Sequence, residues 1–371
     1  MKEKNLKSLI ALTLIPGLGA RRISQIARAY SDAHRVFKLN KLELQRITGI
    51  GESSALSIAQ FDDWDKVDRV IQATEEIGAS IIGINDVLYP EKLRHIYDPP
   101  ALLWVKGDPS VLQKEGVAVI GTRRPTAYGR KLAAQFSTDL VKSGLAVFSG
   151  MAYGIDAIAH KECLNQQGIT VAVLGSGLDE LYPKRNTSLA ELIIEKGGAV
   201  ITEYPPGTKP DAGNFPERNR IVSGLSMGVL VIESAIQGGS MITAEIGLDQ
   251  NKEVFAIPHM LDNASGAGCN YLIKSGQAKL VQTISDVLEE LPVNYKALSE
   301  QHIEKPSRVW KALELNELGN KICCVLEDGP AQIDTLSERL DLSSSQLHTE
   351  LLQLEMKKAI NQKAGKIFTL N

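Results

Sequence analysis

Six basic side chains lie in stretches that follow short apolar runs, where they could bind a phosphate group. They are Arg123, Arg124, Lys184, Arg185, Arg218 and Arg220. Arginine carries a permanent charge and a fork of N–H donors that matches phosphate oxygens, and lysine adds a compact positive charge. Glycines nearby let backbone N–H groups approach a phosphate closely. The small residues that we expect at this site are Gly121, Gly150, Gly154, Gly239 and Ser240.

An alternation of strand-like and helix-like segments positions these residues. The strands that we expect are short and rich in Val, Ile, Leu and Ala, at residues 116–120, 145–148, 170–174, 199–204, 228–233, 253–257 and 278–281. Near-continuous apolar strands indicate that both faces of the sheet are covered. The pattern predicts an α/β fold with a doubly wound, mostly parallel sheet. Its ligand crevice should lie at the carboxyl ends of the strands, where the basic residues fall.

Several of these residues also have a purely structural interpretation. Arg218 and Arg220, which flank Asn219, fit a buried hydrogen-bonded brace in a loop. Asp156 and His160 are four residues apart and fit an ordinary i, i+4 pair on a helix. Because the basic residues recur at successive strand ends, a ligand site is favoured over a set of unrelated braces.

Three aromatic residues are interleaved with the basic ones, namely Tyr128, Tyr182 and Phe215. Aromatic faces stack on nucleobases whatever their sequence, so together with the basic residues they suit a nucleic acid. Tyr182 precedes Pro183, and that pair also fits a simple turn.

Composition excludes several other classes of protein. The chain has 371 residues, 43% of them hydrophobic, and a net charge of −3, so it is long enough for two or three domains but is not a strongly basic module. No leader-like segment or membrane-length apolar run is present, which predicts a cytoplasmic protein with no membrane partner. The four cysteines have neither disulfide-framework nor zinc spacing, so we expect no metal.

Enzyme and cofactor motifs are missing as well. The segment that begins at Gly121 reads Gly-Thr-Arg-Arg-Pro, which is neither a Gly-x-Gly-x-x-Gly fingerprint nor a P-loop. No paired carboxylates or nucleophile–base set stand out. We therefore expect no cofactor, no catalytic residue and no enzymatic activity.

The flanking regions have different patterns. Residues 1–75 predict short helices with Gly-hydrophobic-Gly turns at Gly17–Gly19 and Gly49–Gly51, which resemble helix-hairpin-helix domains that grip DNA phosphates. A helical bundle used only for packing or protein contacts remains equally open. Residues 79–291 form the predicted sheet domain and 292–315 a linker.

The carboxyl-terminal region, residues 316–371, predicts a winged helix, with three helices and a small hairpin around Gly365. Its expected recognition helix begins Ser344-Ser-Gln-Leu-His-Thr-Glu350 and carries no Arg or Lys in that stretch. Since DNA reading depends on positive charge, a protein-contact role is favoured there.

The sequence resembles the DNA-processing protein A family, also called DprA or Smf. The motifs that carry the resemblance lie at residues 121–123, 149–160, 174–183, 215–221, 239–243, 253–258 and 268–270. Two positions depart from the family pattern: His259 stands where a Gly is usual, and Gly238 where a Ser is usual. The first should change a local turn, because Gly tolerates positive φ and His rarely does.

The resemblance implies an extended Rossmann-like fold that binds single-stranded DNA without sequence preference. Members of the family form dimers, protect incoming strands during natural transformation and help to load a RecA-type recombinase; they are not known as enzymes. By this resemblance, the DNA contacts are Arg123, Lys184, Phe215, Arg218, Asn219 and Arg220.

Two alternatives remain. One is a nucleotide-binding enzyme, because Gly238-Gly239-Ser240-Met-Ile-Thr243 with Glu245 loosely echoes the Gly-Gly-x-Gly-Thr loop and acid of nucleoside-monophosphate phosphoribohydrolases. The other is a scaffold for a recombinase, which predicts little DNA affinity in the isolated protein.

Overall fold

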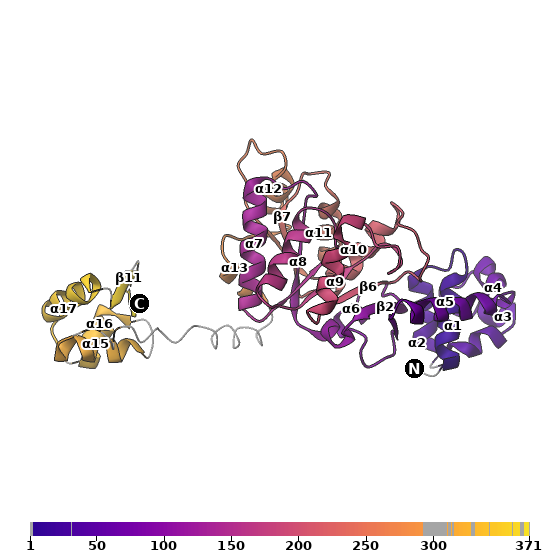
Figure 1. Cartoon of the computed structure of the whole chain (residues 1–371), viewed down its shortest axis with the longest axis horizontal. Coiled ribbons are helices and arrows are strands. Elements are labelled where there is room, and N and C mark those ends of the chain that lie inside the picture. Colours follow the sequence, from indigo (N-terminus) through magenta and orange to yellow (C-terminus); the bar gives the residue numbers. More distant parts are fainter. Residues whose placement is uncertain are drawn as a thin grey trace. The chain divides into compact units, whose positions relative to one another are not determined.

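The computed structural model describes residues 3–30, 32–291, 310, 313, 315–327, 331–340, 342–357, 359–363 and 367–370. They belong to two compact units, Met1–Lys296 and Ala297–Asn371, whose elements are labelled in Figure 1. The predicted linker, residues 292–315, lies almost entirely outside the described residues, and so does the turn predicted at Gly365.

The amino-terminal region is helical. Its elements are α1 (Glu3–Leu14), α2 (Ala20–Ala29), the 3-10 helix η1 (Ala33–Lys38), α3 (Lys41–Leu44), α4 (Glu52–Ala59) and α5 (Trp64–Glu76). Both predicted Gly-hydrophobic-Gly turns lie between helices. Gly17 and Gly49 have φ angles of 76° and 85°, a conformation that glycine adopts without strain.

A sheet of nine strands follows, in the order β1-β2-β6-β5-β4-β3-β7-β8-β9. The strands are β1 (Ser80–Gly83), β2 (Leu102–Gly107), β3 (Gly116–Gly121), β4 (Ala146–Ser149), β5 (Thr170–Val173), β6 (Ala199–Thr202), β7 (Gly228–Glu233), β8 (Glu253–Ala256) and β9 (Lys279–Leu280). All neighbours from β6 to β9 are parallel, whereas β2 pairs antiparallel with β1 and β6. The strand order reverses at β3, between β4 and β7, so the crevice of the fold opens at the carboxyl ends of these strands.

Helices cover both faces of the sheet. They are α6 (Glu91–Arg94), η2 (Pro109–Gln113), α7 (Ala127–Lys142), α8 (Ile155–Asn165), η3 (Lys184–Asn186), α9 (Thr187–Glu195), α10 (Asn214–Leu225), α11 (Gly239–Asp249), α12 (Ala267–Lys274) and α13 (Ile284–Leu288). Val117 and Val119 of β3 pack with α7, α8 and α13, while Ala118 and Ile120 pack in the core that contains α10, α11 and α12. The predicted doubly wound, mostly parallel fold is confirmed.

The helical region and the sheet share one continuous core. Leu9 and Ile26 of the helices belong to the same buried cluster as Trp104 of β2 and Ile221 of α10. The Trp104 indole Nε1–H donates to the Thr74 hydroxyl of α5 at 3.1 Å, and both groups are buried. Because this hydrogen bond is buried, it fixes α5 against β2.

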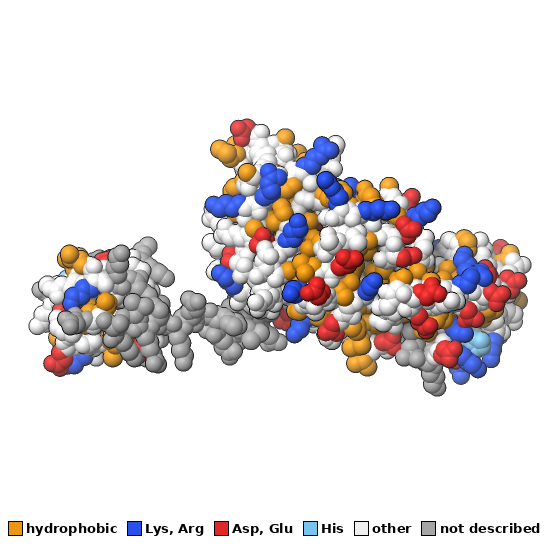
Figure 2. Space-filling view, in the orientation of Figure 1, with side chains coloured by type: hydrophobic (Ala, Val, Ile, Leu, Met, Phe, Trp, Pro, Cys, Tyr) orange, Lys and Arg blue, Asp and Glu red, His pale blue; other side chains and the backbone are white. Residues whose placement is uncertain are grey.

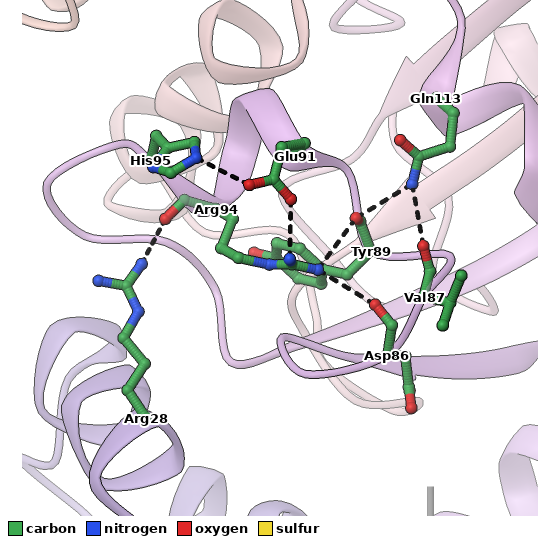
Figure 3. A network of polar contacts seen from close by, with 8 residues as sticks. All are labelled: Arg28, Asp86, Val87, Tyr89, Glu91, Arg94, His95 and Gln113. Atoms are coloured by element: carbon green, nitrogen blue, oxygen red, sulfur yellow. Dashed lines mark hydrogen bonds and ion pairs between the residues drawn. The ribbon is translucent and has the colours of Figure 1, made fainter.

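A polar network makes a second connection between these regions (Figure 3). Arg28 of α2 donates to the backbone carbonyl of Arg94 in α6. The Arg94 guanidinium itself pairs with Glu91 at 2.7 Å, and Glu91 also contacts His95 at 2.8 Å. Gln113 donates to two carbonyls of the turn that precedes α6. The network holds that turn and α6 together beside α2.

The carboxyl-terminal unit contains the predicted helices and hairpin strands. They are α15 (Glu317–Glu327), β10 (Ala331–Gln332), α16 (Ile333–Leu340), α17 (Ser344–Met356), β11 (Ile360–Lys363) and β12 (Ile367–Leu370). The three strands pair in the order β10-β12-β11, so the unit is a winged helix, with one short strand that the sequence did not predict. No helix among the described residues of the chain is long and apolar enough to cross a membrane.

We predict that Thr74→Val lowers the free energy of unfolding by about 1–3 kcal/mol, because it leaves the buried Trp104 N–H without an acceptor. Urea denaturation of the full chain measures the change. In a Trp104→Phe background the same substitution should cost clearly less, since the orphaned donor is gone. An equal cost in both backgrounds would contradict the role given to this hydrogen bond.

Candidate nucleic-acid interface

The segment that carries Arg218 and Arg220, expected to be a loop, is helical in the structure. Phe215 to Ile221 lies inside α10, which begins at Asn214, and Gly239 is the first residue of α11. The expectation of a loop for Arg218 to Arg220 was therefore wrong. Asn214 begins the helix next to the end of β5, where its side-chain amide donates to the carbonyl of Gly175 at 3.1 Å. This contact places the first turn of α10 at the carboxyl edge of the sheet.

Arg218 lies beneath this edge. Its side chain is buried, with a residue exposure of 6%, and Nη1 donates to the backbone carbonyls of Gly150 and Val173. A Cβ on Gly150 would lie 2.3 Å from Nη1, so only glycine permits the guanidinium to approach this closely. Arg218 thus joins α10 to the ends of β4 and β5, as the brace interpretation expects.

Asp156 holds the same loop from the other side. Its Oδ2 accepts hydrogen bonds from the amides of Gly150 at 3.1 Å and Ala152 at 3.3 Å, and the side chain is buried. Asn186 donates to the carbonyl of Met151 at 2.8 Å. These contacts stabilise a turn in which Met151 has a φ of 60°, which is uncommon for a residue other than glycine.

The buried charges perturb one another. Burial raises the pKa of Asp156, and the positive charge of Arg218 opposes the rise. Burial likewise lowers the pKa of the Arg218 guanidinium, with Asp156 opposing. Burial, aided by the charge of Arg218, lowers the pKa of His160 to about 3. His160 is therefore neutral at pH 7, and its Nδ1 pairs with the Thr170 hydroxyl at 2.7 Å; the i, i+4 pair with Asp156 is not the contact that either residue makes.

The loop after β3 rests against this braced turn. A Cβ on Gly154 would lie 2.3 Å from the Thr122 carbonyl, and the Ile155 amide donates to that carbonyl at 3.2 Å. Gly121 is similarly enclosed by the side chain of Ile155. Arg123 is consequently held at the surface, where it is exposed.

Arg123 and two aromatic rings come together at this surface. The Arg123 guanidinium carbon lies 5.8 Å from the centroid of the Phe215 ring, which fits a cation–π contact. The Tyr182 and Phe215 centroids are also 5.8 Å apart, with the rings inclined by 45°. Phe215 packs over Gly175, where an added Cβ would lie 3.0 Å from the ring. A permanent charge and a partly exposed aromatic face are thus presented side by side.

The remaining predicted residues occupy different places. Arg124, Lys184 and Arg185 are exposed, the last two on η3, and Gly239 is exposed at the start of α11. The Ser240 hydroxyl is buried and donates to Ser234.

Arg220 and Asn219 lie farther along α10. Arg220 is buried and forms ion pairs with Glu203 and with Asp98, the latter at 3.4 Å. Asn219 is partly exposed. Arg220 also lines a cleft of about 1310 Å³ between the amino-terminal turns and α10, which Gly19 and Arg21 line as well. This cleft is separate from the contacts between Arg123 and Phe215.

Sequence reasoning missed one buried acid at the crevice. Glu233 ends β7, and its Oε2 accepts from both the amide and the hydroxyl of Thr126 at 3.0 Å. Thr126 in turn caps α7 by accepting from the Gly129 amide at 3.1 Å. The only sign of this contact in the sequence is that a charged residue, Glu233, ends an otherwise apolar run. No group of three or more His, Cys, Asp or Glu side chains suited to a metal occurs among the described residues.

We expect Arg218→Met to lower the free energy of unfolding by about 3–5 kcal/mol, because it leaves Asp156 as an uncompensated buried charge. Chemical denaturation of the full chain measures the loss. The double variant Arg218→Met with Asp156→Asn should recover part of it. Unchanged stability in the single variant would show that Arg218 is not a brace.

Stability should also depend on His160 below neutral pH. The folded-state pKa, about 3, lies below the ordinary value near 6.5, so the unfolded state binds a proton that the folded state does not. The contribution is present above pH 6.5 and is lost as the pH falls towards 3. From pH 7 to pH 5 the loss should be about 2 kcal/mol. His160→Gln should show a shallower fall in urea titrations, and an identical fall would contradict this assignment.

Comparison with known proteins places the chain among DNA-processing proteins. Over 90% of its length it is 34% identical to Protein Smf of Escherichia coli, covering 91% of that protein. It is 40% identical to the DNA processing protein DprA of Bacillus subtilis over 63% of this chain and 78% of that protein.

Two solved structures of DNA processing proteins are also similar to this chain. The DNA processing protein A of Streptococcus pneumoniae is 34% identical and superposes with a TM-score of 0.68, covering 79% of this chain and 99% of that one. A Helicobacter pylori relative, studied for its single-stranded DNA binding mode, is 29% identical with a TM-score of 0.52, covering 60% and 96%. Residues 311–366 match the DprA winged helix domain, and residues 80–292 match DNA recombination-mediator protein A. The chain belongs to the DNA recombination-mediator protein A (DprA/Smf) family.

Proposed function

We propose that this protein binds single-stranded DNA at the carboxyl edge of its sheet, without sequence preference. The observation that carries the proposal is the pairing of an exposed guanidinium, Arg123, with the ring of Phe215 at 5.8 Å, on the helix that also carries the buried Arg218. A positively charged guanidinium binds phosphates, and an aromatic ring stacks on bases. The Helicobacter pylori relative, which is described for its single-stranded DNA binding mode, supports the same assignment.

Each residue has a distinct part in this proposal. The exposed basic side chains contact phosphates; they are Arg123, Arg124, Lys184 and Arg185. The rings of Phe215 and Tyr182 stack on bases. Gly121, Gly150 and Gly154 let the two loops pack closely, and Arg218 braces them from below. Arg220 stays paired with Glu203, so it orients α10 rather than contacting DNA. Asn219, Gly239 and Ser240 flank the path of the strand.

The sequence tolerance follows from the kind of contact. Every base has a face that can stack, and phosphates carry no sequence information. From the family resemblance we further propose that the protein acts by binding rather than by catalysis, in the cytoplasm. It would protect the strand as a homodimer and pass it to a RecA-type recombinase in recombination or natural transformation. The winged helix, with no Arg or Lys in residues 344–350 of α17, would contact protein.

Fluorescence-anisotropy titration of the full chain tests the function. A labelled dT oligomer and a matched duplex are compared at two salt concentrations. We expect tighter binding of the single strand, weakened by salt because bound phosphates release counterions. Absence of binding to either DNA would refute the proposal, and assays for release of a free base from nucleotides would then test the enzymatic alternative.

Charge reversal tests the site. Arg123→Glu should weaken binding of the dT oligomer by about tenfold or more, because it removes a charge-assisted contact. The slope of log affinity against log salt should become shallower by about 0.7 for each phosphate that the variant no longer neutralises. Lys114→Glu is the matched control, since Lys114 is equally charged and exposed but precedes β3 at the opposite edge. If both variants bind like the wild type, the interface lies elsewhere.

A further inference from the structure

Tyr128 is an exposed aromatic side chain that the structure holds in one orientation. It lies in the first turn of α7, just beyond the loop that carries Arg123, and it is 48% exposed. Its ring makes an edge contact with the ring of His259, with centroids 5.4 Å apart and an interplanar angle of 85°. Its hydroxyl donates to the carbonyl of Pro258 at 3.4 Å. These two contacts fix the orientation of the exposed Tyr128 ring.

His259 is itself fixed on several sides. Its Nε2 lies 2.9 Å from the carbonyl of Ile232, and its Nδ1 lies 3.3 Å from the Asn263 side-chain amide. Because a carbonyl oxygen only accepts hydrogen bonds, Nε2 carries the proton, and Nδ1 accepts from Asn263. The backbone of His259 exchanges two hydrogen bonds with Asn270, each of 2.9 Å. A Cβ on Gly266 would lie 2.1 Å from the imidazole, so the ring is packed tightly from below.

The electrostatic surroundings of Tyr128 favour a polyanion. Arg124, Arg130 and Lys131 are exposed close to it in the chain, and Figure 2 shows lysine and arginine side chains gathered over α7 and α12. Of the acids nearby, Glu233 is buried and bonded to Thr126, and Asp262 lies in the loop that follows His259. The Gly129 amide in the first turn of α7 is already used by the Thr126 cap, and the exposed basic side chains would meet the phosphates.

The pair of Phe215 and Tyr182 lies near the end of β5, and Tyr128 lies against His259 near the end of β8, along the same edge of the sheet. Lys184 and Tyr182 follow β5, Arg123 follows β3, and His259 follows β8. Four strand spacings separate β5 from β8 in the sheet order, a distance of about 19 Å. The loop after β3, which carries Arg123 and Arg124, follows a strand that lies between β5 and β8 in the sheet order. A single strand of several nucleotides can therefore contact both aromatic sites.

We propose that Tyr128 is a second nucleobase platform, which His259 positions, and that a strand bound at Arg123 and Phe215 continues across β3 and β7 towards β8. This inference rests on the proposed function and extends it from one pocket to a path. A ring that is already held in place loses little freedom on stacking, so rigid support strengthens binding. His259 acts through Tyr128 and is a positioning residue.

The test compares two oligomers of equal length that carry the same number of phosphates. One is dT throughout, and the other has abasic residues except at its labelled end. In anisotropy titrations of the full chain, Tyr128→Ala should weaken binding of the dT oligomer by about 5- to 100-fold and change binding of the abasic oligomer less than about twofold. Tyr128→Phe should bind both like the wild type. His259→Ala should show the same base-dependent loss as Tyr128→Ala, but a smaller one.

Tyr97→Ala is the matched control, because Tyr97 is also exposed but stacks with Arg21 beside the cleft of the amino-terminal region. It should leave binding of both oligomers unchanged. Equal losses on the dT and abasic oligomers for Tyr128→Ala, or no loss on either, would overturn the platform while leaving the proposed function intact. If the wild type binds neither oligomer, the proposed function itself fails. Tyr128→Leu preserves side-chain bulk and repeats the comparison if the alanine variant misfolds.

Discussion

The candidate interface depends on one buried charge. The guanidinium of Arg218 lies under the carboxyl edge of the sheet, where it donates to the carbonyls of Gly150 and Val173 and faces the charge of Asp156. A charge buried in this way is tolerable only if it is paired and hydrogen-bonded. Arg218 belongs to α10, and its partners come from the turn after β4, from β5 and from α8, so meeting that requirement holds these four elements in one arrangement.

The exposed side chains take their positions from this brace. The turn held by Asp156 and Arg218 packs against the loop after β3 at Gly154, and that loop carries Arg123. The same helix that buries Arg218 carries Phe215 in its first turn. Two arginines therefore have opposite roles: one is buried and structural, and the other is exposed and available to a phosphate. A site that is organised before the ligand arrives has less ordering to lose on binding.

Much of this arrangement follows from local pattern in the sequence. Apolar runs predict the strands of the parallel sheet, and the loops after them predict which edge carries the site. The burial of Arg218 and Arg220 was harder to predict, because both faces of α10 are covered. The two arginines are two residues apart on the helix, so their side chains point in different directions. Both find buried partners: Arg218 donates to the carbonyl of Val173 in the sheet, and Arg220 pairs with Glu203 and Asp98.

The sequence alone does not predict which residues far apart in the chain contact each other. Glu233 and Thr126 are 107 residues apart and meet only because β3 and β7 are neighbours at the point where the strand order reverses. The contact between Tyr128 and His259 arises in the same way, across 131 positions of the chain. Pattern predicts that such residues lie at one edge, whereas the strand order decides which of them touch.

Hydrogen–deuterium exchange of the full chain, with and without a dT oligomer, tests most directly where the strand lies. We expect slower exchange in residues 121–128, 149–154, 175–186 and 214–216, which surround the carboxyl edge, with little change at the opposite edge. Protection confined to the winged helix or to the amino-terminal turns, with these segments unchanged, would contradict this expectation.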